Sequence, residues 1–450
     1  MKKQYYYIVV IIFILFFTVN FINIFRKDIF VDETITYYIV NKLSLREIVR
    51  GVDVHNFYYF IMKILPHNNI YLLRFYSLIV MSMALYSLFI TINKLYNTKT
   101  ALTILVLSSL SMTISEYSTQ ARMYSLLFLF SSLMFYSFST KQYNITLLII
   151  IMSITTHYYA VFLLIPYITT LFLTEKRAIF YKQLKITIIT VSILFLILSP
   201  IIYNQFFSEN NPYKIPPPHD KPTLMSLPSM IIFPLIIPST VTQPIMMLLS
   251  AMMIFLVLYL LFTFNMDFFK KSSQKNHKQI NIFLLLSYIT TFIIFFISFI
   301  GFPYHHRYTI MFFPMVYLLL TLSLNQKPMV EQRLITTLFI IFITITFLSY
   351  QLNPKDQFIK ISKEIKCPSN ILHETPFSFL PMSIYLPNCS HYMALSSDWT
   401  GFTNDTLYTT KDKINNRNVS YDYYIHYFDI LKGMDLLGNS KNITFIKVKD

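Results

Sequence analysis

The sequence predicts an all-α polytopic membrane protein that carries a small C-terminal extracytoplasmic α/β domain. Of its 450 residues, 55% are hydrophobic and 13% are charged, whereas about a quarter of the residues in soluble proteins are charged. Long runs of Ile, Leu and Phe separate the charges, and a run of about 18 apolar residues is long enough to cross a bilayer. These runs do not alternate with polar residues, so a β-barrel is not predicted.

The apolar runs predict about eleven transmembrane helices within a domain of residues 1–350. The first run lacks a small-residue cleavage site, which indicates a retained signal anchor. The count depends on how two short adjacent runs, 144–156 and 158–173, are divided. The predicted helices cover residues 5–25, 70–92, 100–114, 123–138, 144–156, 158–173, 186–204, 242–264, 281–300, 308–324 and 334–350.

The positions of Lys and Arg predict the orientation. With a cytoplasmic N-terminus, the inner segments carry 15 Lys and Arg against three Asp and Glu, and the outer segments before residue 351 carry 11 against eight. Short loops rich in Lys and Arg stay on the cytoplasmic side. The net charge of +16 is therefore a topology signal, and no nucleic-acid partner is predicted. We expect a multi-pass protein of the cell membrane with residues 351–450 outside the cytoplasm.

Two outer segments between the helices have predicted structure of their own. Residues 26–69 are too apolar and periodic for an open loop, and Thr34–Arg50 and Phe57–Leu65 are predicted as helices that lie against the bilayer. Residues 205–241 are interrupted by many prolines, so no continuous helix can form there. We expect a mobile loop with a re-entrant or interfacial piece.

The polar tail, residues 351–450, is long enough for one small domain. Asn370–His373 and Asn442–Val448 are predicted as strands, and Tyr421–Leu431 as a helix. Cys367 and Cys389 are the two cysteines of the chain. Outside the reducing cytosol they form either a disulfide or two free thiols.

Ionisable side chains at the outer ends of the predicted helices are the candidates for function, because they are expensive to keep at a bilayer edge. Asp32 and Glu33 begin an interfacial helix, where Asp32 fits either a helix cap or a general base or metal ligand. Arg122 stands at a helix start, where the dipole disfavours a cation, so it binds an anion or extends toward lipid headgroups. His157 and Arg307 lie at two further outer helix ends. This combination suits a phosphate-bearing lipid and a carboxylate that acts on an acceptor.

These residues resemble the motifs of the GT-C superfamily of polytopic glycosyltransferases, in particular the group related to protein O-mannosyltransferases and aminoarabinose lipid A transferases. The likeness runs in order through residues 1–325. Two prolines that follow the histidine in the family pattern are replaced by Asn56 and Phe57, and the tail carries no family motif. The matching segments are Asp32-Glu33, His55-Asn56-Phe57-Tyr58-Tyr59, Arg74-Phe75-Tyr76-Ser77, Gln120-Ala121-Arg122-Met123-Tyr124, Thr156-His157-Tyr158-Tyr159 and Arg307-Tyr308.

The resemblance implies transfer of a sugar, with inversion, from a polyprenyl-phosphate-linked donor to a hydroxyl of a protein, lipid or glycan acceptor at the outer membrane face. Asp32 would be the base, with Glu33 beside it, and Arg122, Arg307 and His157 would bind the donor phosphate. Some relatives use a divalent cation and others do not, so Asp32, Glu33 and His55 are candidate ligands if a metal is bound. The supporting or acceptor-side residues implied are His55, Tyr58, Arg74, Glu116, Gln120, Tyr124 and Tyr308.

The competing class is a polytopic transporter, or a flippase for lipid-linked sugars, without transferase activity. Transporters place their sites near the midplane of the bilayer, at helices that Gly or Pro interrupts in both halves of the chain. The sequence holds only five glycines and shows no internal repeat, which favours the transferase.

Overall fold

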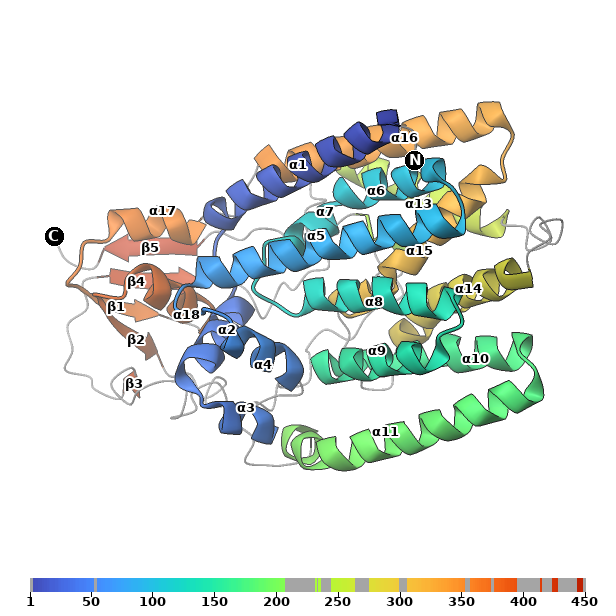
Figure 1. Cartoon of the computed structure of the whole chain (residues 1–450). Helices are drawn as coiled ribbons and strands as arrows, with labels where there is room; N and C mark the ends of the chain where they lie inside the picture. Colours follow the sequence, from blue (N-terminus) through green and yellow to red (C-terminus); the bar gives the residue numbers. More distant parts are fainter. Residues whose placement is uncertain are drawn as a thin grey trace.

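The computed structural model consists of a helical bundle with a small sheet at one end of it (Figure 1). Short helices from the first outer segment lie at the end of the bundle that faces the sheet. The residues described are 3–51, 55–206, 231–232, 234–235, 244–263, 275–298, 306–352, 357–373, 376–394, 413–414, 423–427 and 443–447.

Six helices among the described residues are long and apolar enough to cross a membrane, and a bent pair makes a seventh. The predicted class, a helical polytopic membrane protein, is confirmed, while the count of eleven crossings and their orientation stay predictions. The six are contained in α1 (Lys3–Arg26), α5 (Ile70–Leu95), α11 (Arg177–Phe206), α14 (Lys275–Ile297), η6 (His306–Phe312) with α15 (Phe313–Asn325), and α16 (Met329–Leu352).

The remaining apolar runs form shorter helices. The predicted helix 100–114 is broken, because Ser111 interrupts it: its hydroxyl accepts a hydrogen bond from Ile114 N and donates one to Pro234 O, and the two halves meet at 66°. The shorter helices are α6 (Thr98–Ser109), α7 (Met112–Ser118), α8 (Tyr124–Ser139), α9 (Tyr143–Thr156), η1 (Tyr158–Leu163) with α10 (Leu164–Thr174), and α13 (Pro244–Phe262).

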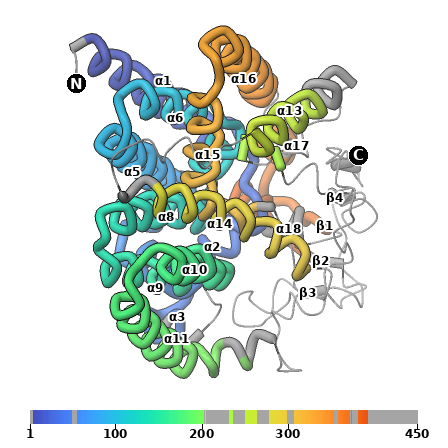
Figure 2. Tube along the Cα trace, turned by 90° about the vertical axis from the view of Figure 1, so that its right-hand side faces the viewer, coloured from blue at the N-terminus to red at the C-terminus, as the bar shows by residue number. Residues whose placement is uncertain are grey.

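Helix α15 lies in the interior of the bundle, packed against α6, α8, α13, α14 and α16 (Figure 2). Its side chains from Phe313 to Leu324 are buried all round. Helix α11 is the opposite case, since most of its apolar side chains are exposed in the structure, as expected of a helix that faces lipid. The predicted Pro-rich loop 205–241 lies almost wholly outside the described residues.

The first outer segment folds into α2 (Val31–Lys42), α3 (Leu45–Gly51) and α4 (Asn56–Ile64). The prediction of one helix over Thr34–Arg50 is wrong, because Ser44 starts a new helix. The Ser44 hydroxyl accepts a hydrogen bond from Glu47 N, and Glu47 Oε2 accepts one from Ser44 N at 2.7 Å. This reciprocal capping box ends α2 and begins α3.

Within the described residues, the C-terminal part holds a five-stranded sheet of order β3-β2-β1-β4-β5, in which β5 pairs antiparallel and the other neighbours pair parallel. The two predicted strands are confirmed as β1 and β5. The predicted helix Tyr421–Leu431 is wrong, since Tyr423–Tyr427 forms β4 between β1 and β5. Its elements are α17 (Gln357–Glu364), β1 (Asn370–His373), α18 (Pro376–Tyr385), β2 (Ser390–Ala394), β3 (Lys413–Ile414), β4 (Tyr423–Tyr427) and β5 (Ile443–Lys447).

The C-terminal part has a core of its own, and Tyr385 packs against both this core and that of the bundle. Helices α17 and α18 contribute Phe358, Ile361 and Met382 to this core. Cys367 and Cys389 form a disulfide, which decides between the two states that the sequence left open. Helix α18 packs against the sheet on one side and against α2 on the other.

Candidate active site

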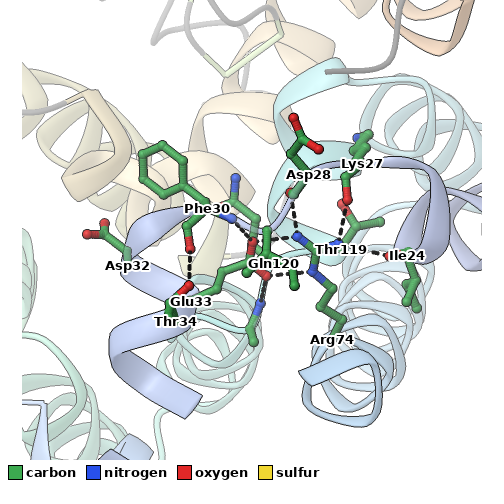
Figure 3. A network of polar contacts seen from close by, with 12 residues as sticks. Ile24, Lys27, Asp28, Phe30, Asp32, Glu33, Thr34, Arg74, Thr119 and Gln120 are labelled. Atoms are coloured by element: carbon green, nitrogen blue, oxygen red, sulfur yellow. Dashed lines mark hydrogen bonds and ion pairs between the residues drawn. The ribbon is translucent and has the colours of Figure 1, made fainter. Parts of the chain in front are cut away.

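Glu33 and Arg74 form a buried ion pair at the start of α2 (Figure 3). Their side chains are 0% and 1% exposed, and Arg74 Nε and Nη2 each donate to a Glu33 oxygen at 2.7 Å. Glu33 also accepts hydrogen bonds from Ala121 N at 2.8 Å and from Phe30 N at 2.9 Å. A buried charge needs a partner and a full set of hydrogen bonds, and Glu33 has both. Its carboxylate has no exposed oxygen that could take up a proton or a metal ion.

The same contacts decide how α2 begins. Phe30 is the residue that precedes the helix, and Glu33, in the third helical position, accepts the hydrogen bond from its backbone N–H. Asp32 lies inside the first turn. The interpretation of Asp32 as the helix cap is therefore wrong, and its carboxylate is available for another role.

The carboxylate of Asp32 points away from Glu33 and Arg74 (Figure 3), because neighbouring residues of a helix are about 100° apart around its axis. It forms ion pairs with Arg122 Nη2 at 3.5 Å and with Arg307 Nη1 at 3.1 Å. The side chain of Asp32 is 20% exposed. The two neighbouring carboxylates thus have different surroundings. Glu33 is enclosed with one arginine, whereas Asp32 lies at a partly open site with two.

Arg122 belongs to the tight turn between α7 and α8. The backbone N–H of Arg122 donates to Gln120 O at 2.8 Å, and its side-chain Nη1 donates to the main-chain O of Asp32 at 3.2 Å. Among the described residues, Nε of Arg122, Nε of Arg307 and the buried hydroxyl of Tyr124 have no hydrogen-bond partner. Buried donors are normally satisfied, so this group of cations and hydroxyls is suited to receive an anion.

Histidine and tyrosine rings surround the arginines. The ring of His157 lies 5.0 Å from that of His55 and 4.8 Å from that of Tyr308. His157 Nδ1 accepts a hydrogen bond from Tyr159 N, so the proton of the neutral ring is on Nε2. Burial, together with His55 and the two nearby arginines, holds the pKa of His157 well below its usual range. The imidazole can therefore donate a hydrogen bond but brings no positive charge.

Other predicted residues support the site from further away. Glu116 forms an ion pair with Lys27 at 3.2 Å and accepts a hydrogen bond from the Gln120 amide at 2.6 Å. Lys27 also donates to the hydroxyl of Tyr350 in α16. These contacts join α1, α7 and α16, and they orient the turn that carries Arg122. Tyr58 is buried in the core of the bundle.

The predicted metal ligands do not come together as a metal site. Glu33 is enclosed with Arg74, and the carboxylate of Asp32 faces two guanidinium groups, which are poor neighbours for a cation. In the part of the chain that the structure describes, no group of three or more His, Cys, Asp or Glu side chains could hold a metal ion. Because these residues do not fit a cation, no chemical step is assigned to one.

Sequence reasoning missed Asp28, whose side chain binds α17 and whose main chain binds Arg74. The only signal in the sequence was an acidic residue between the first apolar run and the Asp32-Glu33 pair. Its partners Phe358 and Ile359 are 330 and 331 residues away, so no local pattern could identify them.

The fold of this chain has counterparts among solved structures. Two solved structures of ArnT from Cupriavidus metallidurans are similar to this chain. The apo structure matches with a TM-score of 0.53 and 10% identity over 88% of this chain and 87% of ArnT. The structure bound to undecaprenyl phosphate matches with a TM-score of 0.56 and 9% identity over 91% and 89%. No family model and no curated protein sequence matches the chain.

Proposed function

We propose that this protein transfers a sugar from a polyprenyl-phosphate-linked donor to an acceptor hydroxyl at the outer membrane face, with inversion and with Asp32 as the base. The observation that carries the proposal is the position of the Asp32 carboxylate, which is partly exposed and lies within 3.5 Å of both Arg122 and Arg307. Such a site combines a proton acceptor with two groups that bind phosphate.

The charges of this group match the reaction. A donor phosphodiester carries one negative charge, and together with Asp32 it balances the two guanidinium groups. When the acceptor oxygen attacks the anomeric carbon, its proton passes to Asp32 and the bond from that carbon to the phosphate oxygen breaks. The leaving polyprenyl phosphate then carries a charge of about −2, which the same two arginines balance. Stabilisation of charge that develops in the transition state is usually the largest catalytic term.

Other residues have secondary roles in this proposal. His157 Nε2 would donate a hydrogen bond to the phosphate without adding charge. Tyr124 and Tyr308 lie beside the arginines and would contact the sugar or the acceptor. Glu33 and Arg74 hold the first turn of α2 in place, so their contribution is to orient Asp32. The ArnT structure with bound undecaprenyl phosphate supports the class of donor.

The test measures the polyprenyl phosphate that is released from the donor. Membranes that contain the protein are incubated with a panel of polyprenyl phosphates, each carrying a different labelled sugar, and free polyprenyl phosphate is quantified. We expect release with the correct donor and a loss of about 10²–10⁴-fold in Asp32→Asn, the usual contribution of a positioned general base. The matched control is Glu47→Gln in the same outer segment, which should stay active because Glu47 only caps α3. Movement of an intact lipid-linked sugar without release would instead indicate a flippase.

A further inference from the structure

Asp28 links the loop before α2 to the C-terminal part of the chain. Its two carboxylate oxygens accept hydrogen bonds from Phe358 N and Ile359 N, each at 3.0 Å, in the first turn of α17. The first N–H groups of a helix have no partner within the helix, and the helix dipole favours a negative charge there. A residue of the first outer segment therefore caps a helix of the C-terminal part.

The main chain of Asp28 faces the other way. Its carbonyl oxygen accepts a hydrogen bond from Arg74 Nη2 at 2.6 Å (Figure 3). The same guanidinium binds Glu33, the residue next to Asp32. A continuous series of hydrogen bonds thus runs from the first turn of α17 to the first turn of α2.

A second contact holds the next residue of the loop. Ile29 N donates to the hydroxyl of Tyr385, in α18, at 2.8 Å. A further hydrogen bond joins the hydroxyls of Tyr38, in α2, and Ser383, in α18, at 2.8 Å. Helices α17 and α18 share one apolar core, and the Cys367–Cys389 disulfide closes the segment that contains α18. These hydrogen bonds therefore hold residues 28 and 29 against residues 357–394, which we call the C-terminal unit.

We propose that Asp28 is a positioning residue through which the C-terminal unit fixes Asp32 between Arg122 and Arg307. The inference rests on the proposed function, because Asp32 is the base there. Arg122 lies in the turn before α8 and Arg307 lies in η6, whereas Asp32 lies in the first turn of α2, next to the loop that the C-terminal unit holds. Loosening the link displaces the base but leaves the donor-binding groups in place. A displacement of about 1 Å can cost about 10²-fold in rate.

The experiment compares Asp28→Asn and Tyr385→Phe with the control Ser362→Ala. Asn lacks the charge and offers one acceptor oxygen to the two N–H groups, and Phe removes the acceptor of Ile29 N. Ser362 lies in the same helix α17, and among the described residues its hydroxyl donates to Ile359 O within that helix. For each variant, kcat and the KM for donor lipid are measured, together with hydrogen–deuterium exchange of the peptide over residues 29–40.

We expect Asp28→Asn to lower kcat by roughly 10- to 100-fold with a smaller change in the KM for the donor, and to speed exchange in residues 29–40. Tyr385→Phe should show the same pattern more weakly, and it carries the test if Asp28→Asn does not fold. Normal kcat and normal exchange in both variants would overturn the inference, as would an equal effect in Ser362→Ala. If the unmodified protein releases no polyprenyl phosphate, the proposed function fails. The link between Asp28 and α2 is tested separately, because unchanged hydrogen–deuterium exchange of residues 29–40 in Asp28→Asn and Tyr385→Phe would overturn it whatever the activity.

Discussion

Asp32 and Arg307 form an ion pair of 3.1 Å between the first outer segment and η6, which precedes the buried helix α15. The contact joins the beginning of the chain to one of its late helices, and Arg122 completes the group from the turn before α8. A phosphate that binds the two arginines must share them with Asp32. Donor binding and the freeing of the base are therefore coupled in the proposed reaction.

Replacing Arg122 by Lys should lower transferase activity by roughly 10- to 100-fold. A guanidinium presents a planar fork of donors to two phosphate oxygens, whereas an ammonium is a single compact charge. Arg122 also donates to the main chain of Asp32, a contact that Lys would lose. Release of polyprenyl phosphate is the measurement, with protein level in the membrane followed in parallel.

Arg46→Lys is the control for this change, since Arg46 lies in α3 of the first outer segment, away from the site, and is exposed. If Arg122→Lys retains full activity, Arg122 only reaches toward lipid headgroups, and the phosphate role passes to Arg307.

The C-terminal part should lose stability as the pH falls below about 6.5, the ordinary pKa of His. His373 Nε2 and His391 Nδ1 lie 2.9 Å apart in the buried interior of the sheet, and burial with the neighbouring His391 holds the pKa of His373 well below its usual range. The folded state binds fewer protons than the unfolded state in this window, so stability is complete above pH 6.5 and declines by about 1.4 kcal/mol per pH unit below it until the folded pKa is reached.

Tryptophan fluorescence can follow this transition, because Trp399 is the only tryptophan in the chain and lies in the C-terminal part. Thermal unfolding at pH 7.5 and pH 5.5 should give a lower midpoint at the acidic pH. His373→Gln keeps an N–H donor without a titrating group, and the difference between the two midpoints should shrink. An unchanged difference in that variant would assign the pH effect to other groups.

The membrane helices could be predicted because hydropathy is a local property of consecutive residues in the sequence. The distinction between Asp32 and Glu33 could not, since adjacent carboxylates look alike in a sequence and differ only in which side of α2 they occupy. Arg74, which pairs with Glu33, lies 41 residues from it in the sequence. Arg307 contacts Asp32 only once the bundle has folded. The strand Tyr423–Tyr427 was mistaken for a helix for the same reason: its partners β1 and β5 lie elsewhere in the chain.

Residues 351–450 should lie outside the cytoplasm. The excess of Lys and Arg on one set of loops fixes the N-terminus inside, and an odd number of crossings then places the tail on the opposite side. The disulfide between Cys367 and Cys389 agrees with an oxidising compartment. A reporter fused after Asp450 that is active only outside the cytoplasm should be active, and activity of a cytosolic reporter at the same point would contradict both the count and the location of the site.

Glu33→Gln should impair folding as well as activity. The variant leaves the Arg74 charge buried without its partner, and breaking a buried pair from one side costs about 3–5 kcal/mol. The double variant Glu33→Gln with Arg74→Gln removes both charges, so it should be less destabilised than the sum of the two single variants. Thermal unfolding and the yield of monodisperse protein in detergent measure this coupling. A Glu33→Gln protein that folds normally but releases no polyprenyl phosphate would give Glu33 a direct part in the chemistry and shift the base by one residue.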